Sequence, residues 1–142
     1  MAVNRPNIRA LGDSSPRALD LSRALQSLTE HFVDDKISIS LKYFRRSCEC
    51  FSEWKKEDLR GLSGVIDKFK ERTGAQIRST TQTCHAHLGD PKRDRFRRPE
   101  NISEDIKFYE IDVTAKARLH GFFVDPVFFL VWLDRKHECF PV

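Results

Sequence analysis

Two histidines and one arginine near the end of the sequence are the side chains best suited to acid–base chemistry on a phosphodiester: His137, His120 and Arg118. A histidine, with an ordinary pKa of about 6.5, can give or take a proton near neutral pH, and a guanidinium can bind two phosphate oxygens at once. Cleavage of RNA without a metal ion needs a base for the 2′-hydroxyl, an acid for the leaving 5′-oxygen and a cation beside the phosphorane. We therefore expect His137 to act as the acid or base, Arg118 to hold the phosphate and His120 to assist in positioning.

Three β-rich runs contain or flank these residues. Ile106–Thr114, Leu119–Val124 and Val127–Leu133 are rich in β-branched and aromatic residues, and short dipeptides separate them. Because short connections favour hairpins, the runs predict a three-stranded antiparallel meander.

The turn at Asp125-Pro126 determines which residues of the last two strands meet. Counting back from this turn places Arg118 and His120 near Asp134, at the end of the last strand. We expect the candidate site at that end of the sheet.

Alternation along the last strand predicts two apolar faces. One face would carry Val127, Phe129, Val131 and Leu133, and the other Phe128, Leu130 and Trp132. A strand that is apolar on both faces is typical of the interior of a sheet covered on both sides.

A structural role for the three candidate residues is the alternative. His120 could only pack on the sheet, and His137 could be a surface residue at a frayed strand end. Arg118 could pair with Asp134 or Asp112.

The preceding sequence predicts two helices and two further strands. A helix begins at Ser15 and ends before Asp34, Ile37–Phe44 alternates as a half-buried strand, and a second helix runs from Ser52 to Arg72. Ala75–Thr83 is a weaker strand. The fold expected is α+β, with helices packed on one side of a small twisted antiparallel sheet. Residues 1–14 read as a flexible arm, and residues 15–142 as a single domain.

A long irregular loop, residues 84–103, interrupts this pattern and carries a basic run. The run contains Lys92, Arg93, Arg95, Phe96, Arg97 and Arg98. Its cations could bind phosphates and its phenyl ring could stack on an unpaired base, with Arg135 and Lys136 as further phosphate contacts. A solvated loop partly neutralised by Asp94 is the equally weighted alternative.

Cysteine and histidine residues raise the possibility of zinc. Cys84, His85 and His87 could combine with Cys48 or Cys50 and with His137 or Cys139, but their spacing does not match the usual zinc-binding patterns. We therefore expect reduced thiols, no metal ion and no cofactor.

Bulk composition sets limits on the partners. The net charge of +4, with 32% charged residues, permits a polyanionic partner without requiring one. No stretch is long and apolar enough to cross a membrane, and the first residues lack the apolar region of a signal peptide. We expect a cytoplasmic protein with no membrane partner.

Several motifs resemble a group of small uncharacterised bacterial and mobile-element proteins. These are the strand Ser40–Phe44, the pair Cys84-His85, and the pattern RLHGF at Arg118–Phe122 continued by FFLVWLDRKH at Phe128–His137. The resemblance extends roughly from Lys36 to Pro141 and implies no assigned chemistry.

A looser resemblance concerns architecture. A helical segment followed by a three-stranded meander, with a histidine just after the last strand, is similar to RelE/ParE-type toxins of toxin–antitoxin pairs. That resemblance implies metal-free cleavage of RNA, in particular ribosome-associated messenger RNA, and an antitoxin protein as partner. His137 matches the terminal acid–base position and Arg118 the arginine of the preceding strand. This chain departs from the family in its additional first helix and its 20-residue loop.

A second hypothesis needs no catalysis. The chain could be an interaction module of a phage-defence or counter-defence system, binding protein or nucleic acid through the basic loop and the first helix. The first hypothesis requires His137, His120 and Arg118 within reach of one phosphate, whereas the second does not.

Overall fold

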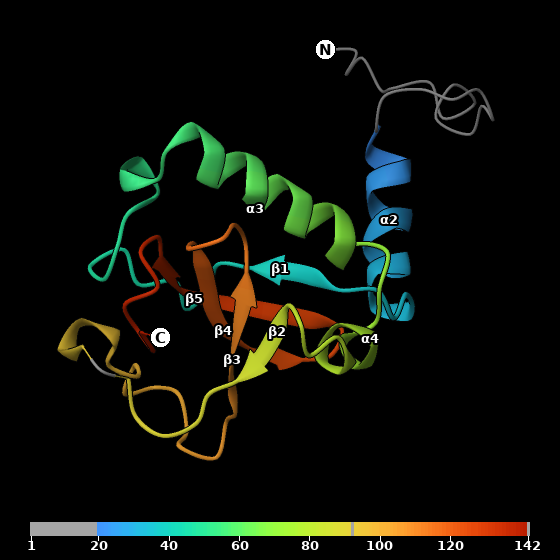
Figure 1. Ribbon diagram of the computed structural model, residues 1–142. Helices are drawn as coiled ribbons and strands as arrows, with labels where there is room; N and C mark the ends of the chain where they lie inside the picture. Colours follow the sequence, from blue (N-terminus) through green and yellow to red (C-terminus); the bar gives the residue numbers. More distant parts are fainter. Residues whose placement is uncertain (1–19, 92, 142) are drawn as a thin grey trace, which may run out of the picture. The chain divides into compact units, whose positions relative to one another are not determined.

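The computed structural model describes residues 20–91 and 93–141, which form two compact units divided between Asp34 and Asp35 (Figure 1). The first unit contains α2 (Leu21–Val33), an amphipathic helix. The predicted helix is therefore present from Leu21 onward, while its expected cap at Ser15 and the arm at 1–14 lie outside the described residues.

The second unit is built on a five-stranded mixed sheet in the order β1-β5-β4-β3-β2. The strands are β1 (Ser38–Ser40), β2 (Cys84–Ala86), β3 (Phe108–Asp112), β4 (Arg118–Val124) and β5 (Val127–Asp134). All neighbouring pairs are antiparallel except β1 and β5, which are parallel. The fold is α+β, but the prediction of a wholly antiparallel sheet was wrong. Since β1 and β5 are the first and last strands, no short turn joins them and dictates an antiparallel pairing.

A β-bulge in the β4–β5 pair changes which side chains of β5 share a face. His120 lies opposite Trp132, but Gly121 lies opposite Leu130, so Val131 has no opposite residue on β4. Strict alternation is lost at this point. Observed clusters place Phe128, Leu130 and Leu133 on one face, and Phe129, Val131 and Trp132 on the other. The prediction therefore put Leu133 and Trp132 on the wrong faces.

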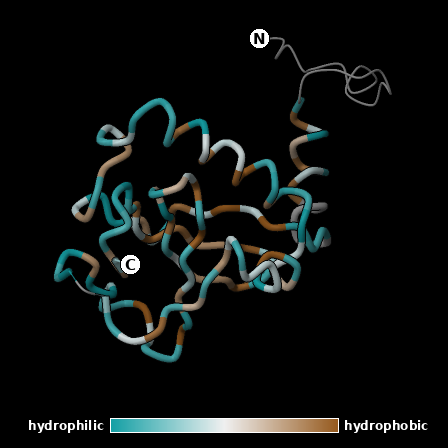
Figure 2. The backbone as a smooth tube through the Cα atoms, viewed as in Figure 1, coloured by the Kyte–Doolittle hydropathy of each residue, from teal (hydrophilic) through white to brown (hydrophobic). Residues whose placement is uncertain are grey.

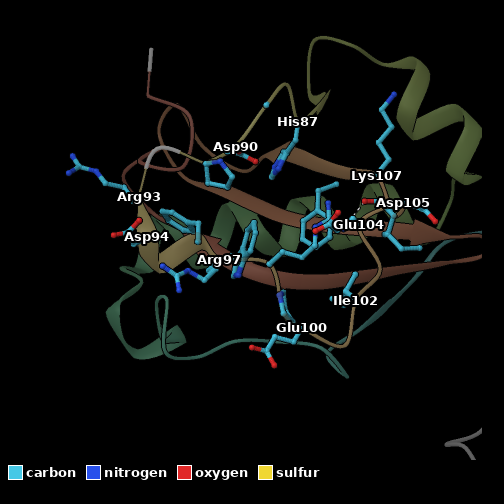
Figure 3. A pocket seen from close by; sticks show the side chains of 18 residues that line it. His87, Asp90, Arg93, Asp94, Arg97, Glu100, Ile102, Glu104, Asp105 and Lys107 are labelled. Atoms are coloured by element: carbon cyan, nitrogen blue, oxygen red, sulfur yellow. Dashed lines mark hydrogen bonds between the residues drawn. The ribbon is translucent and has the colours of Figure 1, made fainter.

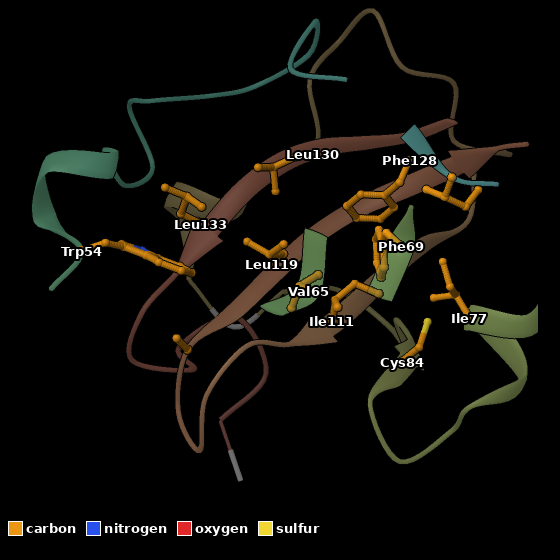
Figure 4. Packing of buried hydrophobic residues seen from close by; sticks show 12 residues of the cluster. Trp54, Val65, Phe69, Ile77, Cys84, Ile111, Leu119, Phe128, Leu130 and Leu133 are labelled. Carbon is orange, nitrogen blue, oxygen red and sulfur yellow. The ribbon is translucent and has the colours of Figure 1, made fainter. Parts of the chain in front are cut away.

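The first face of the sheet is covered by α3 (Lys56–Phe69) and α4 (Gly74–Ser79) (Figure 1). Figure 4 shows the resulting core, in which Val65 and Phe69 of α3 and Ile77 of α4 meet the side chains of the strands. Apolar residues are concentrated along the strands (Figure 2). Neither α3 nor α4 contributes to the core on the other face, so these two helices pack on one side of the sheet.

The described segments that cover the second face are irregular apart from one 3-10 turn, η2 (Asp94–Phe96). The core on this face comprises Cys48, Phe96, Ile102, Phe108, Phe122, Val131, Trp132 and Cys139. Thus the long loop after β2 and the C-terminal segment after β5 both anchor apolar side chains against the sheet. The loop and the C-terminal segment therefore also enclose the polar side chains that the central strands direct toward this second face.

Two helical segments differ from the sequence prediction. The helix expected from Ser52 to Arg72 is instead a 3-10 turn, η1 (Phe51–Glu53), followed by α3. The strand expected at Ala75–Thr83 is helix α4, because Thr73 caps it: the Thr73 hydroxyl accepts from the backbone N–H of Gln76, and the Gln76 side chain accepts from that of Thr73. No helix in residues 20–91 or 93–141 combines the length and apolar character that a bilayer crossing requires.

Candidate functional site

Several polar side chains form a hydrogen-bonded chain beneath the apolar core on the second face of the sheet. Nε2 of His87 lies 2.8 Å from Nδ1 of His120, and Nε2 of His120 lies 3.0 Å from Oδ2 of Asp134. His120 and Asp134 are both 0% exposed. Backbone N–H groups of Glu138 and Cys139 donate to the two oxygens of Asp134 and fix the carboxylate. The candidate histidine of β4 is therefore an interior residue held at both ring nitrogens.

Glu110 and His137 extend this group toward the surface. Oε1 of Glu110 lies 2.8 Å from Nε2 of His137 and 4.0 Å from Nε2 of His120. His137 has a backbone φ of 55°, in the left-handed region that residues other than glycine adopt only a few per cent of the time. The structure thus brings His137 and His120 together through one carboxylate, as the pairing of β4 and β5 led us to expect. We name Glu110, His120, Asp134 and His137 the carboxylate–histidine cluster.

Burial and hydrogen bonding act in opposite directions on these groups. Burial by itself raises the pKa of Asp134, but hydrogen bonds from His120, Glu138 and Cys139 hold that pKa below its ordinary value. Burial, reinforced by His120, lowers the pKa of His87 to about 3. Asp134 is therefore ionised at neutral pH and His87 is neutral. Burial also raises the pKa of the Cys139 thiol, which is protonated at neutral pH.

The guanidinium of Arg118 is bound by residues of the adjacent turn and strand. Its Nε lies 3.0 Å from Oδ1 of Asp112, and its terminal nitrogens donate to the carbonyl oxygens of Thr114, Ala115 and Ala117. These contacts close the turn between β3 and β4. Although Arg118 lies opposite Asp134 in the sheet, its guanidinium pairs with Asp112, which was one of the two structural alternatives.

The described residues offer two groups of potential metal ligands, and both include His120. One is Glu110, His120 and Asp134; the other is His87, His120 and Cys139, with candidate ligand atoms within 4.8 Å of one another in each. The set considered from sequence is assembled only in part: His87 and Cys139 meet around His120, whereas the other members lie apart. Cys84 lies in the core beneath the helices, Cys48 donates to the Arg95 carbonyl oxygen in the other core, and His85 lies 3.5 Å from Asp112.

A cavity of about 960 Å³ opens between the long loop and the sheet (Figure 3). His87 and Trp132 form part of its lining. The charged residues described around it are Arg93, Arg97, Arg98, Lys107, Asp90, Asp94, Glu100, Glu104 and Asp105. Carboxylates thus balance the cations in this cavity, which does not have the excess positive charge that favours phosphate.

The basic run of the loop is divided between surface and interior. Arg93, Arg95 and Arg97 are exposed, while Arg98 donates to the carbonyl oxygens of Ser103 and Ile106. Lys92 lies outside the described residues. Phe96 is 1% exposed and packs against Trp132, with ring centroids 5.8 Å apart. This burial leaves no ring face for a base, contrary to the stacking role expected from sequence, because the phenyl group is needed to cover the second face of the sheet.

Exposed cations from three segments gather near the end of β5. Arg45 donates its backbone N–H to the Val131 carbonyl oxygen, and the buried Glu49 carboxylate accepts from the backbone N–H of Arg135. Cys48, between them in sequence, contacts Arg95, whose guanidinium pairs with Glu138 at 2.9 Å. We define the cationic surface as Arg45, Arg46, Arg95, Arg135 and Lys136, of which Arg135 is partly buried and the others are exposed.

Sequence reasoning assigned no role to Arg45, Arg46 or Glu110. The approach of Arg45 and Arg46 to β5 depends on the parallel pairing of β1, which no local pattern specifies. Glu110 had a usable signal: it is a carboxylate in the middle of an otherwise β-forming run, FYEID. His87 was considered only as a zinc ligand beside Cys84 and His85, and its contact with His120 had no signal, because it depends on the path of the loop.

Comparison with known proteins adds no relative. No protein-family model matches the chain, and neither a curated protein nor a solved structure matches it.

Proposed function

We propose that this chain is an RNA-binding protein of the toxin–antitoxin type, which holds the RNA backbone on the cationic surface. The observation that carries the proposal is the gathering of Arg45, Arg46, Arg95, Arg135 and Lys136 from three separate segments. Phosphate contacts from lysine and arginine supply most of the affinity of sequence-independent RNA binding. A partner antitoxin would cover this surface with acidic residues.

The proposed activity is binding and not metal-free cleavage. A bound phosphate cannot reach His120, which is 0% exposed, and Arg118 already contacts Asp112 and three carbonyl oxygens. Of the three residues expected to be catalytic, His137 is the most exposed, with 15% of its side chain accessible against 11% for Arg118 and 0% for His120. A single accessible histidine engaged by a carboxylate does not supply the second proton-transfer group that the reaction needs.

The experiment measures binding of a single-stranded RNA oligonucleotide by fluorescence anisotropy over a range of salt concentrations. The test variant is Arg45→Ala/Arg46→Ala, because both side chains are exposed. Loss of two phosphate contacts should reduce the slope of log affinity against log salt by about 1.4. The control is Lys68→Ala/Lys70→Ala, which removes the same charge from exposed positions at the end of α3.

Two results would refute the proposal: no RNA binding by the wild type, or an equal loss in both double variants. Induced expression in bacteria adds a separate readout. We expect slowed growth with intact messenger RNA for the wild type, and normal growth for Arg45→Ala/Arg46→Ala. Fragmented RNA would instead support a nuclease.

A second candidate function is protein binding by a non-catalytic module of a defence or counter-defence system. The balanced charges of the 960 Å³ cavity favour it, because such a lining suits a polar protein segment better than a polyanion. Failure of RNA binding, combined with weaker growth inhibition in an Arg93→Ala/Arg97→Ala variant, would favour this candidate.

A further inference from the structure

The carboxylate–histidine cluster brings three potential ligand atoms together from the three central strands. Glu110 comes from β3, His120 from β4 and Asp134 from the end of β5, and their ligand atoms lie within 4.8 Å of one another. Nε2 of His120 lies 4.0 Å from Oε1 of Glu110 and 3.0 Å from Oδ2 of Asp134. These three atoms border one small volume, and His137 contacts it from outside, with its Nε2 2.8 Å from Oε1 of Glu110.

Ordinary hydrogen bonding does not account for two of these atoms. Oε1 of Glu110 and Nε2 of His137 are both buried, and neither makes a hydrogen bond of acceptable geometry despite lying 2.8 Å apart. A second carboxylate, Asp134, lies beside the imidazole of His120. Two carboxylates and two histidines enclosed together carry a large desolvation cost unless a cation is placed among them.

The spacing fits the coordination shell of a divalent metal ion. Zinc binds imidazole nitrogen and carboxylate oxygen at about 2.0–2.2 Å, so tetrahedral ligand atoms lie roughly 3.3–3.5 Å from one another. The separations of 3.0 and 4.0 Å from Nε2 of His120 to the two carboxylates bracket that range. We propose that Glu110, His120 and Asp134 bind a divalent transition-metal ion, for which Zn²⁺ is the best match.

Outer contacts already orient the ligands. The backbone N–H groups of Glu138 and Cys139 hold both oxygens of Asp134. Nδ1 of His120 lies 2.8 Å from Nε2 of His87, which leaves Nε2 of His120 to bind the metal when Nδ1 carries the proton. Such hydrogen bonds to the remote ring nitrogen are a usual accompaniment of metal-binding histidines.

The ion would join the three central strands, because its ligands come from β3, β4 and β5. His137 would act as an outer contact: its imidazole lies 2.8 Å from Oε1 of Glu110 and would orient that carboxylate. The left-handed backbone conformation of His137 accompanies this contact. The inference goes beyond the proposed RNA binding and does not depend on it.

The first experiment is metal analysis of the full-length protein, purified without chelator, by inductively coupled plasma mass spectrometry. We expect about one zinc ion per chain. Protein treated with a chelator and then supplied with Zn²⁺ should melt roughly 10 °C higher than without it, since ligands that bind only the folded state stabilise it. A wild type that folds without zinc and whose melting temperature does not respond to Zn²⁺ overturns the proposal.

Conservative variants test the ligand assignment. Glu110→Gln, which alters a ligand, should weaken zinc binding by at least about 100-fold, whereas His137→Gln should weaken it by about 10–100-fold, as is typical for loss of an outer contact. The matched control is His85→Gln on the neighbouring strand β2, whose side chain is 42% exposed; it should bind zinc as the wild type does.

A rival site shares His120 but uses His87 and Cys139. Substitution of Co²⁺ for Zn²⁺ in the wild type distinguishes the two without depending on the folding of any variant. A tetrahedral spectrum without thiolate charge transfer supports the carboxylate–histidine cluster. A thiolate band that disappears in Cys139→Ser assigns the metal to the rival site and overturns the proposal.

Discussion

Replacement of Phe96 by alanine tests how the long loop is held against the sheet. Phe96 belongs to the basic run of the loop, yet its side chain is 1% exposed and packs against Trp132 and His120. If the ring were a surface platform for bases, its removal would change the free energy of unfolding by no more than about 0.5 kcal/mol.

The structure predicts a far larger effect. A fully buried phenylalanine removes about 150–250 Å² from water, which at about 25 cal/mol per Å² corresponds to roughly 4–6 kcal/mol as an upper bound. Measured losses for Phe→Ala in protein cores are about 3–5 kcal/mol. Because Phe96 also covers the interior His120, its removal would admit water to the carboxylate–histidine cluster. We expect a loss of about 3–5 kcal/mol.

Urea denaturation followed by tryptophan fluorescence measures this change, since Trp132 lies 5.8 Å from the ring that is removed. Leu88→Ala is the control in the same loop, because Leu88 is 87% exposed and its loss should alter stability by less than about 0.5 kcal/mol. Equal stabilities of Phe96→Ala and the wild type would refute the placement of the loop. A large loss in Leu88→Ala would refute it as well.

Two further predictions concern the sheet and its turn. Gly121→Ala should destabilise the protein by about 2–3 kcal/mol, because a Cβ there would lie 2.0 Å from the Phe129 carbonyl oxygen. The control is Gly64→Ala in α3, where a Cβ meets nothing within 4 Å and the substitution should be neutral or stabilising by up to about 1 kcal/mol. Thermal melting of the two variants measures the difference. The two hydrogen bonds from the Arg78 guanidinium lower the pKa of Asp125 in the folded protein. The stabilisation from this pair is therefore fully present above the pKa of Asp125 in the unfolded chain, about 3.9, and is lost as the pH falls through the lower pKa of the folded protein. Since Asp125 is half exposed, Asp125→Asn should lower the free energy of unfolding by less than about 1 kcal/mol near neutral pH. Below about pH 4 the variant should lose less stability than the wild type, which urea denaturation at several pH values measures. An unchanged pH dependence would contradict the pairing of Asp125 with Arg78.

Local patterns in the sequence were sufficient for most of the elements of the sheet. The runs before and after Asp125-Pro126 became β4 and β5, and the apolar stripe of the second helix became the face of α3 that packs on the sheet. These features depend on residues close together in the chain, so their periodicity is visible without tertiary contacts. The prediction of a strand at Ala75–Thr83 overlooked one local signal, the Thr73–Gln76 capping box, which outweighs the weak strand propensity of that stretch.

Sheet order and side-chain direction required the tertiary structure. The parallel pairing of β1 with β5 joins segments that are distant in the chain, and nothing local specifies it. The β-bulge beside Gly121 reverses the expected faces of Trp132 and Leu133, because one unpaired residue shifts all that follow.

The same distinction applies to the candidate site. The sequence alone determined that His120 and His137 would lie near Asp134, since one short turn sets the register of β4 and β5. It could not determine that loop and C-terminal segments would bury His120 completely, or that Glu110 would stand between the two histidines. Residue type and register establish which side chains meet, but their exposure depends on how distant segments fill the space above the sheet. That difference separates an open acid–base site from an enclosed cluster suited to a metal ion.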